Sequence, residues 1–288
     1  MSIIGVGNDT YLFVNGLIVN RSIELNKDII ILPITAEFDY ESASKLIKND
    51  IDFSVVVLSG SNLYSQIRIT AETAEDLAAK AWNAQWDCLL LGALINNSVM
   101  SNIQCDKPVE ALKEADYLNV TNYELRGIIG ESKELTEKDD EWIKTHYKSA
   151  YRLLDNQQYQ TAVHCMSTYL WHSLPRVQIA ILWSGIESLF NVSTEISFRL
   201  SLCIANFLSE NDKEKAKEVF TKVRKLYNLR SAAVHGNKMK GDINQLVQDS
   251  ADLLSALIKK CAELETLPDK DNLIFGHEEE QACPGIID

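Results

Sequence analysis

Short runs rich in β-branched, aromatic and other apolar residues recur through the first 130 positions, and one of them, 66–70, alternates with polar residues as a half-exposed strand should. Strands are expected at 11–19 around the turn signal Asn15-Gly16, and at 29–34, 52–58, 66–70, 102–105 and 117–123. Residues 73–96 have the apolar spacing of a helix, with Thr73 as the expected N-cap. These patterns predict a mixed α/β domain over residues 1–130.

A charged stretch at 131–141 marks the expected domain boundary. Beyond it, apolar residues recur at helical spacing, which predicts an all-α bundle over residues 136–266. The expected helix starts are Thr136 as an N-cap, Pro175 in a first turn, Ser193 or Thr194 as an N-cap, and Asn211 with Glu214 as a capping pair. A last helix is expected at 242–264, and residues 267–288 are expected to form a flexible acidic tail. The predicted fold class is therefore α+β.

Composition favours a cytoplasmic, soluble protein. The chain has 288 residues, of which 46% are hydrophobic, and its start lacks the pattern of a signal peptide. The longest apolar run, 88–95, is much shorter than the roughly 20 residues that span a bilayer, so no membrane contact is expected. The six cysteines include no Cys-x-x-Cys pair, which favours reduced thiols.

Charge is distributed unevenly along the chain. The net charge is −13, yet residues 211–240 contain nine Lys or Arg and only three acids. This stretch is either a solvated helix face or a surface for RNA. The RNA-binding candidates within it are Lys222, Arg224, Lys225, Lys238 and Lys240.

The basic stretch contains a pair of residues suited to phosphodiester chemistry, Arg230 and His235. Arginine is a permanent cation whose planar fork matches phosphate, and histidine moves protons near neutral pH. Gly236 fits the position just after a helix, where the C-terminus favours a protonated histidine. Glu187 lies in an otherwise apolar helix, and a buried carboxylate needs a partner, for which a nearby arginine is the natural choice.

Three segments together resemble the HEPN superfamily, and within it the ApeA-like HEPN domains associated with bacterial defence. They are residues 185–190 (GIESLF), 196–200 (ISFRL) and 227–236 (YNLRSAAVHG). The resemblance covers about residues 140–265. It implies a HEPN-like helical bundle that forms a homodimer, with metal-independent endoribonuclease activity. It also implies that Arg230 and His235 are the catalytic pair and that Glu187 is the helix-borne acid of the family.

Three further residues are supporting candidates. Ser231 stands where many HEPN members have Asn, Asp or His. Tyr227 lies one helical turn before Arg230 and either packs against it or contacts substrate. Arg199 either lines the cleft or pairs with an acid. No cofactor and no metal site are expected, because His, Cys and Asp do not cluster at ligand spacing and His164-Cys165 stands alone. The five tryptophans are expected in the core or an interface, with base stacking as the alternative.

These features favour an endoribonuclease, a toxin or anti-phage defence effector that cleaves RNA at a dimer interface. The N-terminal domain would sense or recruit. That domain, a regulatory partner or antitoxin, or an infection signal would restrain the enzyme. The alternatives are a non-catalytic HEPN module that binds nucleotide, RNA or a partner protein, and a structural adaptor that only dimerises.

Overall fold

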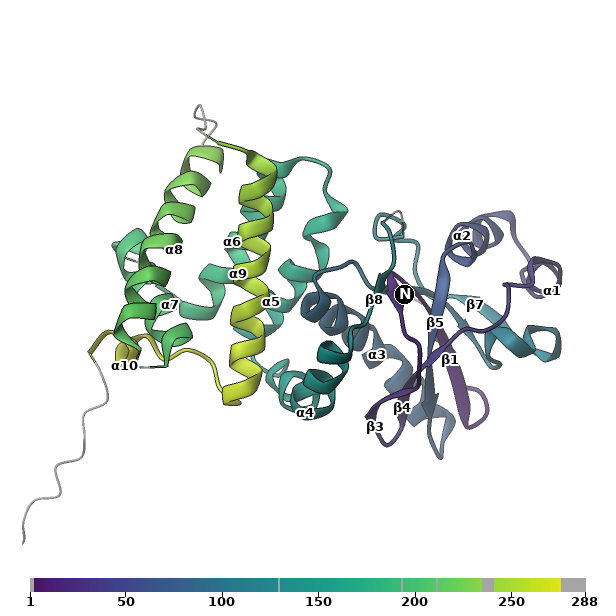
Figure 1. The fold of residues 1–288 in the computed structure, drawn as a ribbon. Helices are drawn as coiled ribbons and strands as arrows, with labels where there is room; N and C mark the ends of the chain where they lie inside the picture. The colour runs from purple at the N-terminus through teal and green to yellow at the C-terminus, as the bar shows by residue number, and fades with distance from the viewer. Residues whose placement is uncertain (1–2, 129, 193, 211, 235–240, 276–288) are drawn as a thin grey trace, which may run out of the picture.

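A computed structural model describes residues 3–128, 130–192, 194–210, 212–234 and 241–275. The chain is α+β, with an antiparallel sheet in its N-terminal half and a helical bundle in its C-terminal half (Figure 1). No helix within these ranges is long and apolar enough to cross a bilayer.

The six-stranded sheet has the order β3-β4-β5-β1-β6-β7, and every neighbouring pair is antiparallel. Its strands are β1 (Asp9–Asn15), β3 (Ile23–Asn26), β4 (Ile29–Pro33), β5 (Leu63–Thr70), β6 (Met100–Cys105) and β7 (Leu118–Val120). Two short strands, β2 (Leu17–Ile18) and β8 (Lys133–Glu134), pair in parallel beside it. Because β8 lies in the predicted boundary stretch 131–141, the first part of that stretch still belongs to the N-terminal half.

Helices cover both faces of the sheet. On one face lie α1 (Tyr40–Leu46), α2 (Asp50–Gly60) and the 3₁₀ helix η1 (Val109–Glu114), around a small core that includes Phe13, Val56 and Ile103. On the other face lies α3 (Ala74–Ile95). Successive residues of a strand point to opposite faces, which is why Leu12 belongs to the core on the α3 side while Phe13 does not.

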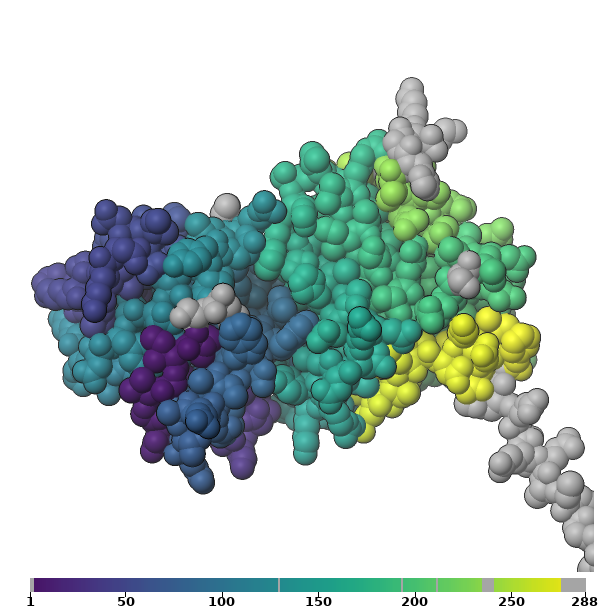
Figure 2. Space-filling model, turned by 180° about the vertical axis from the view of Figure 1, so that it is seen from behind, coloured from purple at the N-terminus to yellow at the C-terminus, as the bar shows by residue number. Residues whose placement is uncertain are grey.

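The bundle packs against the far side of α3. Its helices are α4 (Glu137–Leu153), α5 (Gln157–Thr168), the 3₁₀ helix η2 (Tyr169–Trp171), α6 (Pro175–Phe190), α7 (Ile196–Ser209), α8 (Lys213–Val234), α9 (Ile243–Leu264) and α10 (Lys270–Phe275). One continuous apolar core joins the α3 face of the sheet to the bundle. Figure 2 shows the two halves meeting in a closed surface, with the C-terminal segment that includes α10 lying against the bundle.

Several predicted helix starts are confirmed. Thr73 caps α3, Thr136 forms a capping box with Asp139 at the start of α4, and Pro175 occupies the first turn of α6. Two starts differ from the prediction. Glu195, in the left-handed region at φ 48°, precedes α7 in place of Ser193 or Thr194.

The start of α8 also differs. The carboxylate of Asp212 accepts hydrogen bonds from the backbone N–H groups of Glu214 and Lys215. Asp212 therefore caps the start of α8, the role that was expected of Asn211. Asn211 and Ser193 lie outside the described residues.

One strand prediction in the N-terminal half is wrong, and one turn signal has a different role. Residues 52–58 belong to helix α2, because the side chain of Asn49 caps the helix start and Val55 and Val56 fill the core under the sheet. The Asn15-Gly16 pair does not form a hairpin either, since β1 and β2 belong to different sheets. Gly16 has φ +84°, and a Cβ there would lie 1.8 Å from the carbonyl oxygen of Ser98. Glycine is needed at this position for a close backbone approach.

The segment predicted as a flexible tail begins with ordered structure. Helix α10 packs on α7, and Asn206 donates a hydrogen bond of 2.6 Å to the carbonyl oxygen of Leu273. Residues 276–288 lie outside the described part of the chain.

Candidate functional site

The predicted partner of Glu187 is confirmed as Arg230. Glu187 is on α6 and Arg230 is on the neighbouring α8, and Nη2 of the arginine lies 3.0 Å from Oε1 of the glutamate. The side chains are 17% exposed for Arg230 and 32% exposed for Glu187, so the pair lies at the edge of the core. Burial raises the pKa of Glu187, and the positive charge of Arg230 opposes that shift.

An aromatic ring also contacts the guanidinium. The Cζ atom of Arg230 lies 5.5 Å from the centre of the Tyr227 ring, one turn earlier on α8. Tyr227 in turn meets Trp183 edge to face at 5.4 Å, and the buried Trp183 donates a hydrogen bond of 3.0 Å to Ser250 on α9. Burial and the charge of Glu187 raise the pKa of Tyr227, which keeps its hydroxyl protonated. Tyr227 thus packs against Arg230, as one of the two predicted alternatives had it.

Arg230 keeps unused hydrogen-bonding capacity. Its Nε is buried, and no described residue accepts a hydrogen bond from it. A buried donor without a partner costs about 1–3 kcal/mol, so an acceptor supplied to this atom would stabilise the site.

The end of α8 is attached to the start of α6. Arg176 donates a hydrogen bond to the carbonyl oxygen of Ala233, one of the last carbonyls of α8. A cation at this place is favourable because helix C-termini carry partial negative charge. Sequence reasoning missed Arg176, since nothing in the residues around it indicates a partner so far along the chain. His235, Lys238 and Lys240 follow this end and lie outside the described residues.

The other predicted site residues have different environments. Ser231 is half-buried next to Arg230. Arg199 forms an ion pair with Glu195, the residue just before its own helix, with Nε 3.6 Å from Oε2, as the alternative of an acidic partner predicted. Lys222, Arg224 and Lys225 are exposed along α8, away from the core.

Tryptophans and cysteines serve mainly in packing. Trp183 is fully buried, whereas Trp82 is 50% exposed. The five cysteines among the described residues are free thiols. Within the described ranges, no group of three or more His, Cys, Asp or Glu residues is placed to hold a metal ion.

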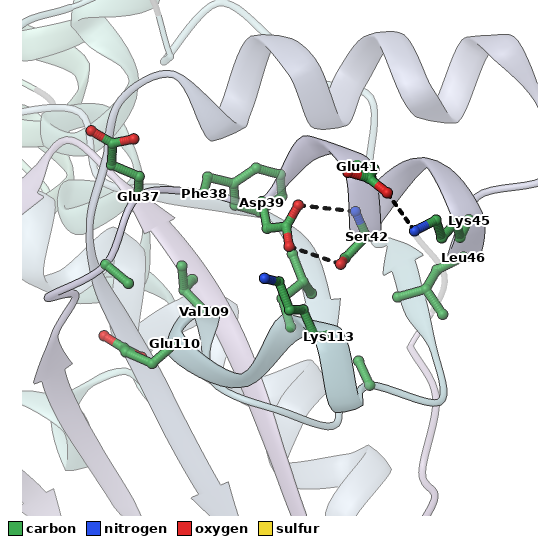
Figure 3. A pocket seen from close by; sticks show the side chains of 13 residues that line it. Glu37, Phe38, Asp39, Glu41, Ser42, Lys45, Leu46, Val109, Glu110 and Lys113 are labelled. Carbon is green, nitrogen blue, oxygen red and sulfur yellow. Dashed lines mark hydrogen bonds and ion pairs between the residues drawn. The ribbon is translucent and has the colours of Figure 1, made fainter.

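A further pocket lies elsewhere, in the N-terminal half. It has a volume of about 760 Å³, is open to solvent, and is lined by residues from 36–46 and 109–115 (Figure 3). Its polar groups mostly pair with one another. Ser42 donates hydrogen bonds to Asp39 through its backbone N–H and its hydroxyl, and these bonds lower the pKa of Asp39. Lys45 forms an ion pair with Glu41 at 2.7 Å. Sequence reasoning did not identify this pocket.

Comparison with protein-family models, with curated proteins and with solved structures finds no match to this chain.

Proposed function

We propose that the chain is a metal-independent endoribonuclease of the HEPN type that acts as a homodimer, as a toxin or anti-phage defence effector. The observation that supports this best is the setting of Arg230. This cation pairs with a carboxylate and contacts an aromatic ring at the edge of the core, five residues before His235. A guanidinium fixed in this way is suited to stabilise charge on a phosphoryl group.

RNA supplies its own nucleophile for this reaction, the ribose 2′-hydroxyl. The 2′-oxygen attacks phosphorus as a base removes its proton, and the bond from phosphorus to the 5′-oxygen breaks as an acid protonates that oxygen. His235 from each of two chains takes one of these roles. Arg230 stabilises the charge that develops on the non-bridging oxygens, and Glu187 orients Arg230. The products are a 2′,3′-cyclic phosphate and a 5′-hydroxyl.

One observation favours a second candidate, a non-catalytic module. Glu187 already neutralises much of the charge of Arg230, as a structural ion pair between α6 and α8 would. In that case the helical half binds nucleotide, RNA or a partner protein without cleaving it.

A cleavage assay separates the two candidates. The purified chain is incubated with mixed RNA in EDTA, and fragments with cyclic phosphate ends are measured. We expect cleavage by the natural chain and none by Arg230→Ala or His235→Ala. Arg230→Lys keeps the charge but loses the planar fork, so it should also lose most activity. Arg152→Ala is a matched control, because Arg152 on α4 forms an exposed pair with Glu265, the residue just after α9. Full activity of Arg230→Ala would refute the assignment.

A further inference from the structure

Helix α8 presents an unusual concentration of unpaired positive charge. It contains seven Lys or Arg and two acids, on a chain whose net charge is −13. Apart from Arg230, none of these cations forms an ion pair with a residue of the described ranges. The six unpaired cations are Lys213, Lys215, Lys217, Lys222, Arg224 and Lys225, and all are exposed.

Two aromatic rings lie on the same surface. Phe198 of α7 is 50% exposed, so one face of its ring is open to solvent. It meets Phe220 of α8 edge to face, with ring centres 5.6 Å apart. The guanidinium carbon of Arg224 lies 5.9 Å from the centre of the Phe220 ring. Phe220 and Arg224 also line a shallow groove of about 370 Å³ along α8.

The surface residues of α8 form a row that leads along the helix to the candidate site. Lys217, Phe220, Arg224 and Ser231 follow one another at intervals of three, four and seven residues, so they form one row along the helix. Phe220 and Arg230 are ten residues apart, which corresponds to about 15 Å along the helix axis. That distance is the length of a few nucleotides at a stacking rise of about 3.4 Å.

We propose that Phe198, Phe220 and Arg224 form a base-stacking subsite, which makes a single-stranded segment of RNA the substrate. This inference rests on the proposed function and specifies its substrate. An exposed ring beside unpaired cations matches a strand whose phosphates carry negative charge and whose bases have free faces. In a duplex the base faces are already stacked, and the deep groove of the RNA helix excludes side chains.

A second copy of the chain is a less suitable occupant of this surface. A two-fold interface brings the same patch of both copies together. The six unpaired cations of α8 would then face those of the partner, with only Glu214 and Glu218 on each helix to offset them. A polyanion neutralises them instead.

The test uses binding, so that its outcome does not depend on cleavage. Oligonucleotides with 2′-O-methyl riboses lack the nucleophile and cannot be cut. Affinity is measured for three such probes: a 12-nucleotide single strand, the same strand in a duplex, and a strand of equal length without bases. We expect the natural chain to bind the single strand most tightly. Phe198→Ala should weaken that binding at least about fivefold, and Phe198→Trp should preserve it. Neither variant should change binding of the strand without bases.

Two matched controls accompany this test. Phe275→Ala removes an aromatic ring that is 81% exposed on another helix, and it should leave binding unchanged. Lys217→Gln, in the row, should weaken binding of every probe and reduce its salt dependence, more than Lys215→Gln on the opposite side of α8.

Equal affinity of the natural chain and Phe198→Ala for the single strand would overturn the subsite. So would a change of oligomeric state in Phe198→Ala, seen by light scattering, because it would show that the ring lies in a protein interface. Absence of cleavage by the natural chain, with base-dependent binding intact, would instead refute the proposed nuclease activity and leave the subsite standing.

Discussion

The buried carboxylate of Asp87 makes the stability of this protein depend on pH in a defined direction. Asp87 is on α3, faces the bundle and is fully buried. Its Oδ1 accepts a hydrogen bond of 2.6 Å from the hydroxyl of Tyr147 on α4, and its Oδ2 has no hydrogen-bond partner among the described residues. Burial raises the pKa of Asp87 from 3.8 to about 7, although the hydrogen bond from Tyr147 opposes the shift.

The direction of the pH dependence follows from the number of protons bound by the folded and the unfolded chain. Between about pH 4 and pH 7 the folded chain holds a proton on Asp87 that the unfolded chain has lost, so the free energy of unfolding falls as pH rises. A shift from 3.8 to about 7 corresponds to about 4 kcal/mol in total, at about 1.4 kcal/mol per pH unit. This stabilisation is fully present below the pKa of Asp87 in the unfolded chain, and it is lost once the pH exceeds the pKa of Asp87 in the folded chain.

Asp87→Asn removes the titration and keeps an oxygen for Tyr147. We expect urea denaturation to show that, between pH 5 and pH 8, the natural chain loses about 3 kcal/mol of unfolding free energy relative to Asp87→Asn. Asp116→Asn, at an exposed aspartate, is the control and should follow the natural chain. Parallel pH profiles for the natural chain and Asp87→Asn would refute the reasoning.

Three further substitutions test the packing, each by denaturation. Gly16→Ala should destabilise the protein by more than about 2 kcal/mol, because it combines a positive φ with a contact to Ser98, and a soluble, equally stable variant would contradict this. Gly185→Ala places a Cβ 2.9 Å from Leu254, so we expect a loss of about 1–3 kcal/mol and not the gain usual for Gly to Ala in a helix. Thr136→Ala removes a capping box and should cost about 1 kcal/mol, whereas an unchanged midpoint would show that α4 does not need its cap.

Much of the bundle could be predicted from the sequence, because its helices carry local signals. Thr136, Pro175 and the apolar spacing of 242–264 specify their helices without help from distant residues. The sheet was less predictable. A run such as residues 52–58 fits a strand or a buried helix equally well, and contact with the sheet decides between them.

The candidate site, too, could be predicted only in part from the sequence. The pairing of Glu187 with an arginine follows from chemistry, since a carboxylate in an apolar helix requires a counter-charge. The hydrogen bond from Arg176 to Ala233 and the contact of Phe198 with Phe220 depend on how α6, α7 and α8 pack, and no local pattern encodes them.

The position of α3 has a mechanical consequence. This helix packs on the sheet, and from its other side Ser167 and Ser255 of the bundle donate hydrogen bonds to its backbone carbonyls. Both halves therefore need α3 to complete their apolar cores, and they should unfold together in a single cooperative transition. A tilt imposed on α3 by something bound to the sheet would pass directly to α5 and α9, because both helices pack on it.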